Sequence, residues 1–231
     1  MGAALALGGC EALPAGDIGS ILGDISANAP LTTAEIDAGL RQALEIGAGN
    51  VTGRLGREGG FFNDQTVRIP LPGRLGELQT ELAKVNLSGP LDDLQTRMNA
   101  AASASMPKAR ELVVGAITSM TVEDAVGILR GGDTAATDYL RLRTQDELTA
   151  AFSPVFNDAL AASGVFQTLD NVGSRYGLGA VTSDVRTDFT AHAVEFGLNG
   201  LFFYVAQEEQ RIREEPVART TELLRRVFGS R

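Results

Sequence analysis

The chain has very little of several residue types on which catalysis and metal binding depend. Among its 231 residues there is one cysteine, Cys10, one histidine, His192, and no tryptophan. A single cysteine excludes an internal disulfide, and one cysteine with one histidine cannot form a structural zinc site of the usual kind. The nucleophile elbow G-x-S-x-G and the phosphate loop G-x-x-x-x-G-K-[ST] are also absent. We therefore expect no catalytic residues, no metal and no cofactor, and a role that is not enzymatic.

Positive charge is scarce as well. The chain has 20 Lys and Arg residues against 29 Asp and Glu residues, which gives a net charge of −9 and a pI of about 4.7. Because nucleic-acid binding and docking on anionic lipid both require a basic face, this balance argues against both. No run approaches the roughly 20 apolar residues that span a bilayer. Any attachment to a membrane is therefore expected to be through a lipid.

The cysteine stands in a sequence typical of a lipidation site. Leu7-Gly8-Gly9-Cys10 follows a short apolar run and offers two small residues before the thiol, as bacterial lipoprotein processing requires. Only nine residues precede Cys10 and none is basic, whereas a complete signal has a basic start and about 7–15 apolar residues. With a start further upstream we expect a periplasmic protein anchored to the outer membrane by a lipid on Cys10. With a start at Met1 we expect a cytoplasmic one.

From residue 32 onward, apolar residues recur at steps of three or four, the period of an amphipathic helix. No pair of strands with a hairpin turn is recognisable. The pattern predicts an all-α bundle of about eight to ten helices in one domain, residues 31–231, behind a truncated signal and flexible tether, residues 1–30. Capping signals predict helix starts at Thr32, Thr121, Asp133 and Thr144, and Pro107 is predicted to open a helix.

Residues 57–74 interrupt the helical period with paired glycines and two prolines, and Phe61 and Phe62 lie in the middle. Loops of this length are uncommon in compact domains and are often functional. Two interpretations remain open. The phenylalanines plug the bundle core from the loop, or the loop covers a pocket for an apolar small molecule or lipid, with Phe61, Phe62, Asn63 and Asp64 as contacts.

Charged residues gather near the C-terminus, where Arg213 and Arg219 belong to an arginine cluster interleaved with glutamates. Such a cluster could receive an acidic partner, but alternating charge usually marks a solvated helix face, which is the interpretation we favour. His192 shares a face with apolar residues and is expected to be a core or boundary residue with a hydrogen-bond partner. The acidic pairs Asp92-Asp93, Glu123-Asp124 and Glu208-Glu209 fit helix starts and helical ion pairs better than a catalytic site.

Three blocks of sequence resemble the bacterial domain-of-unknown-function family 4197. These are Gly59 to Pro72, with Gly-Gly-Phe-Phe-Asn-Asp and Ile-Pro-Leu-Pro; Met120 to Tyr139; and Leu198 to Gly229. The resemblance implies a helical domain that is commonly exported and often lipid-anchored, and it implies no activity. The leading hypothesis is a periplasmic lipoprotein that binds another protein or has an envelope-associated role. The alternatives are an apolar carrier and a carboxylate-based hydrolase.

Overall fold

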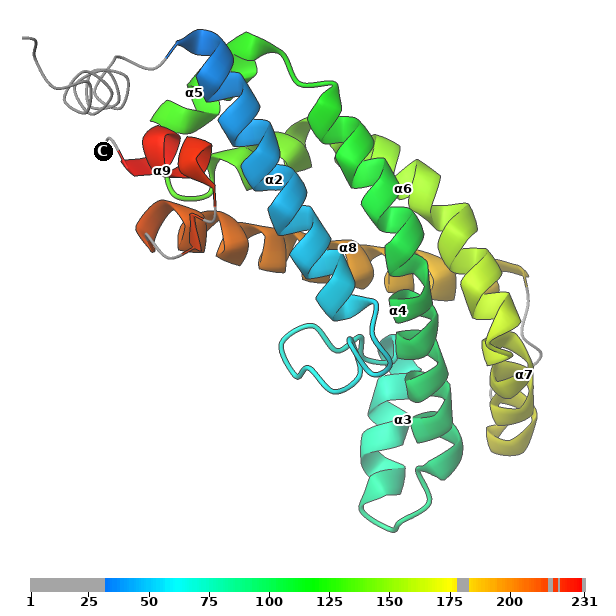
Figure 1. Cartoon of the computed structure of the whole chain (residues 1–231). Coiled ribbons are helices and arrows are strands. Elements are labelled where there is room, and N and C mark those ends of the chain that lie inside the picture. The colour runs from blue at the N-terminus through cyan, green and yellow to red at the C-terminus, as the bar shows by residue number, and fades with distance from the viewer. Residues whose placement is uncertain (1–31, 178–182, 216–217, 220, 230–231) are drawn as a thin grey trace, which may run out of the picture. The chain divides into compact units, whose positions relative to one another are not determined.

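The computed structural model describes residues 32–177, 183–215, 218–219 and 221–229. Cys10 and the tether predicted before residue 31 lie outside them. This part of the chain is helical and contains no strand, which confirms the predicted fold class (Figure 1). Its helices are α2 (Thr33–Leu55), α3 (Gly73–Ala83), α4 (Gly89–Thr118), α5 (Val122–Arg130), α6 (Ala135–Ala162), α7 (Val165–Tyr176), α8 (Ser183–Glu214) and α9 (Glu222–Gly229).

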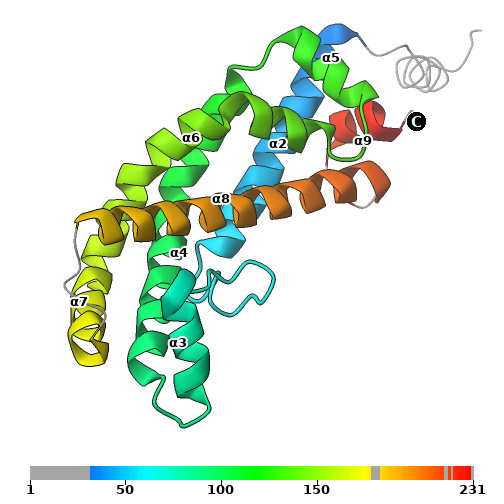
Figure 2. The same cartoon turned by 180° about the vertical axis from the view of Figure 1, so that it is seen from behind.

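The helices form a layer with one long helix across it. Helices α2, α4 and α6 pack in that order, and α8 crosses one face of the layer in contact with all three (Figures 1 and 2). Helices α5 and α9 pack against the N-terminal half of α2 at one end, and α3 and α7 flank the opposite end of α4. The core lies between the layer and α8, and its largest fully buried side chains include Phe61, Phe152, Phe156, Phe189 and Met98.

Two long helices run through points where the sequence predicts a break. Helix α4 continues through Pro107 and α6 through Thr144 and Pro154, so the predicted helix starts at Pro107 and Thr144 are wrong. An interior proline costs about 3 kcal/mol because it removes a backbone hydrogen bond and clashes with the preceding turn. Tertiary packing offsets that cost here. Met106 and Phe156, which flank the two prolines, are almost completely buried.

The predicted cap of α6 is also wrong. The N-cap is Thr134 rather than Asp133, and its hydroxyl donates to the Asp138 side chain at 3.0 Å and accepts no hydrogen bond from a backbone N–H of the first turn. The carboxylate of Glu209 takes that role from α8, because it accepts hydrogen bonds from the backbone N–H groups of Ala136 and Thr137, both at 2.9 Å. A carboxylate near a helix N-terminus is favoured by the helix dipole. The start of α6 is therefore fixed by a residue more than seventy positions away in the sequence.

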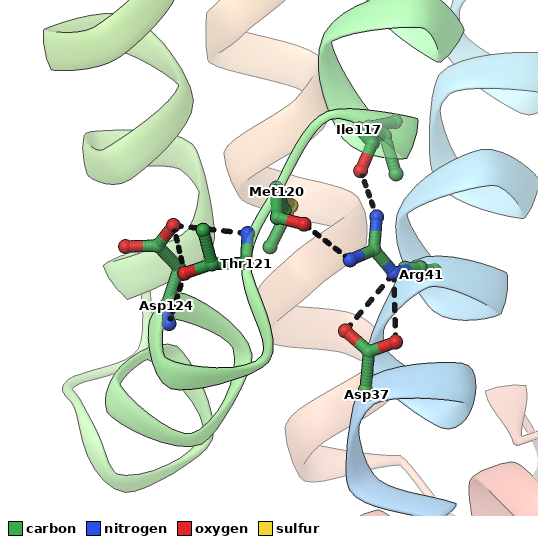
Figure 3. A network of polar contacts seen from close by, with 6 residues as sticks. All are labelled: Asp37, Arg41, Ile117, Met120, Thr121 and Asp124. Carbon is green, nitrogen blue, oxygen red and sulfur yellow. Dashed lines mark hydrogen bonds and ion pairs between the residues drawn. The ribbon is translucent and has the colours of Figure 1, made fainter. Parts of the chain in front are cut away.

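The turn between α4 and α5 is held by side chains on both sides (Figure 3). Arg41 of α2 donates to the carbonyl of Ile117 at 2.6 Å and to that of Met120, and Asp37 orients its guanidinium at 2.9 Å. Thr121 and Asp124 form the predicted capping box at the start of α5. These bonds satisfy carbonyls at the end of α4 and N–H groups at the start of α5, which would otherwise lack partners. The turn thereby docks onto α2.

Two glycines permit close approach between helices. A Cβ at Gly39 of α2 would lie 2.7 Å from Val227 of α9, and one at Gly197 of α8 would lie 2.7 Å from the ring of Phe156 in α6. Glycine inside a helix costs up to about 1 kcal/mol relative to alanine. Close packing between helices at these two contacts explains why glycine occupies both positions.

Candidate functional site

The described residues form a polar groove beside the C-terminal half of α8. Two adjoining pockets of about 440 and 480 Å³, both open to solvent, share Arg54 at the end of α2. We call them together the α2–α8 groove. It lies where α2, α8 and the loop after α2 come together (Figure 2). Its lining consists of Asn50, Val51, Arg54, Arg57, Glu58, Gly59, Gly60, Asn63, Asp64, Gln65, Tyr204, Gln207, Glu208, Gln210, Arg211, Glu214 and Glu215.

At the junction of the two pockets, Arg54, Asp64 and Tyr204 form a closed triangle. Tyr204 Oη donates to Asp64 Oδ2 at 2.5 Å, and Arg54 Nη2 donates to the same carboxylate oxygen at 2.8 Å and to Tyr204 Oη at 3.0 Å. The Arg54 guanidinium also lies 4.1 Å above the centre of the Tyr204 ring. These bonds tie the loop to both α2 and α8. The triangle thus fixes the floor of the groove.

Two side chains of the triangle, Asp64 and Tyr204, have shifted pKa values. Partial burial acts to raise the pKa of Asp64, but the hydrogen bonds from Tyr204 and the Thr66 backbone N–H, with the charge of Arg54, hold it below its ordinary value. Burial and the hydrogen bond to Asp64 raise the pKa of Tyr204. Asp64 therefore stays ionised and Tyr204 stays protonated near neutral pH, which suits a structural latch better than proton transfer.

Replacing Asp64 by asparagine is expected to lower the free energy of unfolding at pH 7 by about 1–3 kcal/mol, since the triangle's bonds are made to a charged group. Because the folded-state pKa of Asp64 is depressed, its contribution is present above the unfolded-state pKa of about 3.9 and is lost as the pH falls through the folded-state value. Urea unfolding between pH 7 and pH 2.5 should therefore show a smaller loss of stability on acidification in Asp64→Asn than in the wild type. Glu81→Gln serves as the control, because Glu81 and its partner Lys84 are both well exposed. Parallel acid profiles for Asp64→Asn and the wild type would contradict the latch.

The loop that carries Phe61 and Phe62 is folded against the core. The Phe61 side chain is completely buried. Its ring lies so close to Gly200 that a Cβ at that position would crowd it. Phe62 is partly exposed and lies under the Arg68 guanidinium, which is 4.9 Å from the ring centre. Neither phenylalanine lines the groove, whereas Asn63 and Asp64 do. Of the four candidate contacts in the loop, the structure thus brings two to the groove.

Arg213 and Arg219 lie away from the groove, near α9. Arg213 is buried and pairs with Glu209 at 2.7 Å, both side chains being less than 5% exposed, and it donates to the Ile128 carbonyl at 3.0 Å. Arg219 donates to the carbonyls of Ile212 and Arg213 at the end of α8. The predicted solvated face is wrong for Glu209 and Arg213, because α5, α6 and α9 cover them. It holds for Glu208 and Arg211, which form a partly exposed pair at 2.5 Å.

The remaining candidates have structural explanations. His192 is a boundary residue, as predicted: its Nε2 lies 2.8 Å from the Pro70 carbonyl oxygen, and its ring contacts that of Phe196 at a tilt of 35°. Asp92 and Asp124 accept hydrogen bonds from Ser88 and Thr121 in the first turns of α4 and α5. Ser105 and Lys108 form an S-x-x-K pattern, the spacing of the nucleophile and lysine in some serine enzymes. The Ser105 hydroxyl is buried and donates to Ala101, while exposed Lys108 pairs with Glu111, so the two are not a catalytic pair.

The described residues contain neither a cluster of metal ligands nor a single helix that could cross a bilayer. No three of their His, Cys, Asp and Glu side chains are grouped so that they could hold a metal ion. No single described helix is long and apolar enough to cross a bilayer; α4 and α5 pass that test only as a pair, and they are bent by 98° where they meet.

The decisive comparison is with protein families. The model of a family of proteins of unknown function, DUF4197, matches residues 30–229. The chain belongs to the DUF4197 family. No curated protein and no solved structure gives a significant match.

The three sequence blocks that resemble DUF4197 fall on distinct parts of the structure. The first, residues 59–72, lies in the loop after α2, which lines one pocket of the groove. The second, residues 120–139, runs from the turn held by Arg41 through α5 into the start of α6. The third, residues 198–229, supplies the C-terminal half of α8 and all of α9. The first and third blocks, separated by more than a hundred residues, meet in the Arg54–Asp64–Tyr204 triangle. Sequence reasoning did not find this groove, although Asn63 and Asp64 pointed to one of its edges.

Proposed function

We propose that this DUF4197 protein is a lipid-anchored, non-enzymatic protein of the bacterial envelope that binds another macromolecule in the α2–α8 groove. The observation that carries the proposal is the groove itself, a long, solvent-open hollow with a polar lining. The lipidation signal at Cys10 supports the anchor. The acidic net charge argues against nucleic acid as the bound molecule.

The geometry favours this role over a carrier. Pockets that enclose small apolar ligands usually have about 300–1,000 Å³ and bury most of the ligand. The apolar pocket among α2, α8 and α9 has only about 20 Å³, and Phe61 occupies the space beneath its loop. A hydrolase would need carboxylates that converge without partners on a substrate. Of the carboxylates that line the groove, Asp64 is instead held by Arg54 and Tyr204, and Glu208 is paired with Arg211.

Photo-crosslinking in cells tests this role. With a photoreactive amino acid in place of Gln207, which lines the groove, we expect irradiation to give a macromolecular adduct in the membrane fraction. The matched control carries it at Gln145, an exposed glutamine of α6 that does not line the groove, and should give no such adduct. Cys10→Ser should move the protein to the soluble fraction. The absence of an adduct at Gln207, or equal adducts at Gln207 and Gln145, would contradict binding in the groove. A Cys10→Ser protein that stays in the membrane fraction would contradict the lipid anchor.

A further inference from the structure

The α2–α8 groove is rich in carboxamide side chains. Asn50, Gln207 and Gln210 line one pocket, and Asn63 and Gln65 line the other. None of the five has a side-chain hydrogen bond to another described residue, unlike the carboxamide of Asn99, which bonds to both backbone groups of Ile69 in the core. A carboxamide offers a donor and an acceptor together, as a backbone peptide group does. The five carboxamides of the groove could therefore bond to the backbone of a bound polypeptide in the way that Asn99 bonds to the backbone of Ile69.

The groove lacks what a sugar chain or a nucleic-acid base would use. Of the described side chains that line it, Tyr204 alone is aromatic. The Arg54 guanidinium covers one face of its ring, the side chain is 94% buried, and its hydroxyl is bonded to Asp64. Stacking on a free aromatic face is the main sequence-independent contact by which proteins hold unpaired bases, and flat sugar faces bind in the same way. An extended polypeptide needs no such face.

Charge is unevenly distributed along the groove. Arg54 is paired with Asp64, and Arg211 with Glu208. Glu214 and Glu215 are exposed at the C-terminal end of α8, and their carboxylates have no hydrogen-bond or ion-pair partner among the described residues. A positively charged side chain of a ligand is therefore favoured there.

We infer that the α2–α8 groove binds an extended polypeptide segment, whose backbone pairs with the carboxamides of Asn50, Gln207 and Gln210 and whose basic side chain lies at the C-terminal end of α8. The inference rests on the proposed function, which requires only that the groove bind a macromolecule. It adds the chemical class of that macromolecule and the way it is recognised. This mode resembles the addition of a strand to a sheet edge, except that side-chain amides replace the edge.

The test begins with a phage-displayed library of random octapeptides selected on the full chain. We expect enrichment of peptides that contain Lys or Arg, and the best of these is then synthesised with a fluorescent label. Fluorescence anisotropy should show affinity about three- to tenfold lower for Gln207→Leu and for Gln210→Leu, as expected for one lost hydrogen bond each. Gln145→Leu, on α6, should bind as the wild type does. The double variant Glu214→Gln/Glu215→Gln should bind about tenfold less tightly and with a weaker dependence on salt.

A second form of the peptide separates backbone recognition from side-chain recognition. Methylation of alternate backbone nitrogens leaves every side chain in place but removes every second N–H donor of the peptide. Binding should therefore weaken at least tenfold. Unchanged affinity of the methylated peptide, or no enrichment of any octapeptide, would overturn the inference. Groove-dependent binding of N-acetylglucosamine oligomers in place of peptides would overturn it too. The proposed function would still stand in each case if Gln207 gives its adduct in cells.

Discussion

Arg213→Met is expected to lower the free energy of unfolding by about 3–5 kcal/mol, because it leaves the carboxylate of Glu209 buried without its cation. Both side chains are almost inaccessible to water, and Glu209 also accepts hydrogen bonds from the Thr137 hydroxyl and the backbone at the start of α6. For a chain of this length, such a loss corresponds to a fall in Tm of roughly 6–20 °C. Thermal and urea unfolding followed by circular dichroism measure it directly.

The matched control is Arg211→Met, two residues earlier on the same helix. Arg211 also pairs with a glutamate one turn away, but its side chain is 44% exposed, and exposed pairs contribute about 0–1 kcal/mol. Comparable losses in the two variants would show that Arg213 is not buried as the structure has it. The double variant Arg213→Met/Glu209→Met should recover part of the loss, because it removes the unpaired charge while leaving the start of α6 uncapped.

This ion pair also shows where sequence reasoning succeeded and where it failed. The spacing of Glu209 and Arg213 predicts their pairing along a helix, and they do pair. The same spacing cannot tell whether the helix face is solvated, because α5, α6 and α9 are brought over it by contacts distant in the sequence. The side-chain oxygens of Glu209 cap α6 for the same reason, so a local rule that placed the cap at Asp133 was bound to miss it.

The groove was harder to foresee than the fold. Helical class follows from a periodicity that each segment carries by itself, so it was predicted correctly even where Pro107 and Thr144 suggested additional helix starts. The groove requires Arg54 and Tyr204, which are 150 positions apart, to meet over Asp64. Tyr204 gave no signal in the sequence beyond an aromatic residue in a long helix. Of the residues that line the groove, only Asn63 and Asp64 were indicated by the sequence, because they lie in an unusually long loop.

Phe61→Ala has the second large expected effect, and it decides between the two interpretations of that loop. The side chain is completely buried, and phenylalanine to alanine substitutions in well-packed cores lower the free energy of unfolding by about 3–5 kcal/mol. The loss arises from apolar surface returned to water and from the cavity left against Val67 and Gly200. Urea unfolding at pH 7 measures it, and Phe61→Leu, which retains more of the volume, should lose clearly less.

Phe62→Ala is the control within the same loop. Because Phe62 is partly exposed beneath Arg68, its removal should cost only about 1 kcal/mol or less. A lid over an apolar ligand would give a different pattern. Both variants would then unfold much as the wild type does and would differ from it in ligand binding. A core plug instead gives a large difference in stability between two adjacent phenylalanines, which is what the burial of Phe61 requires.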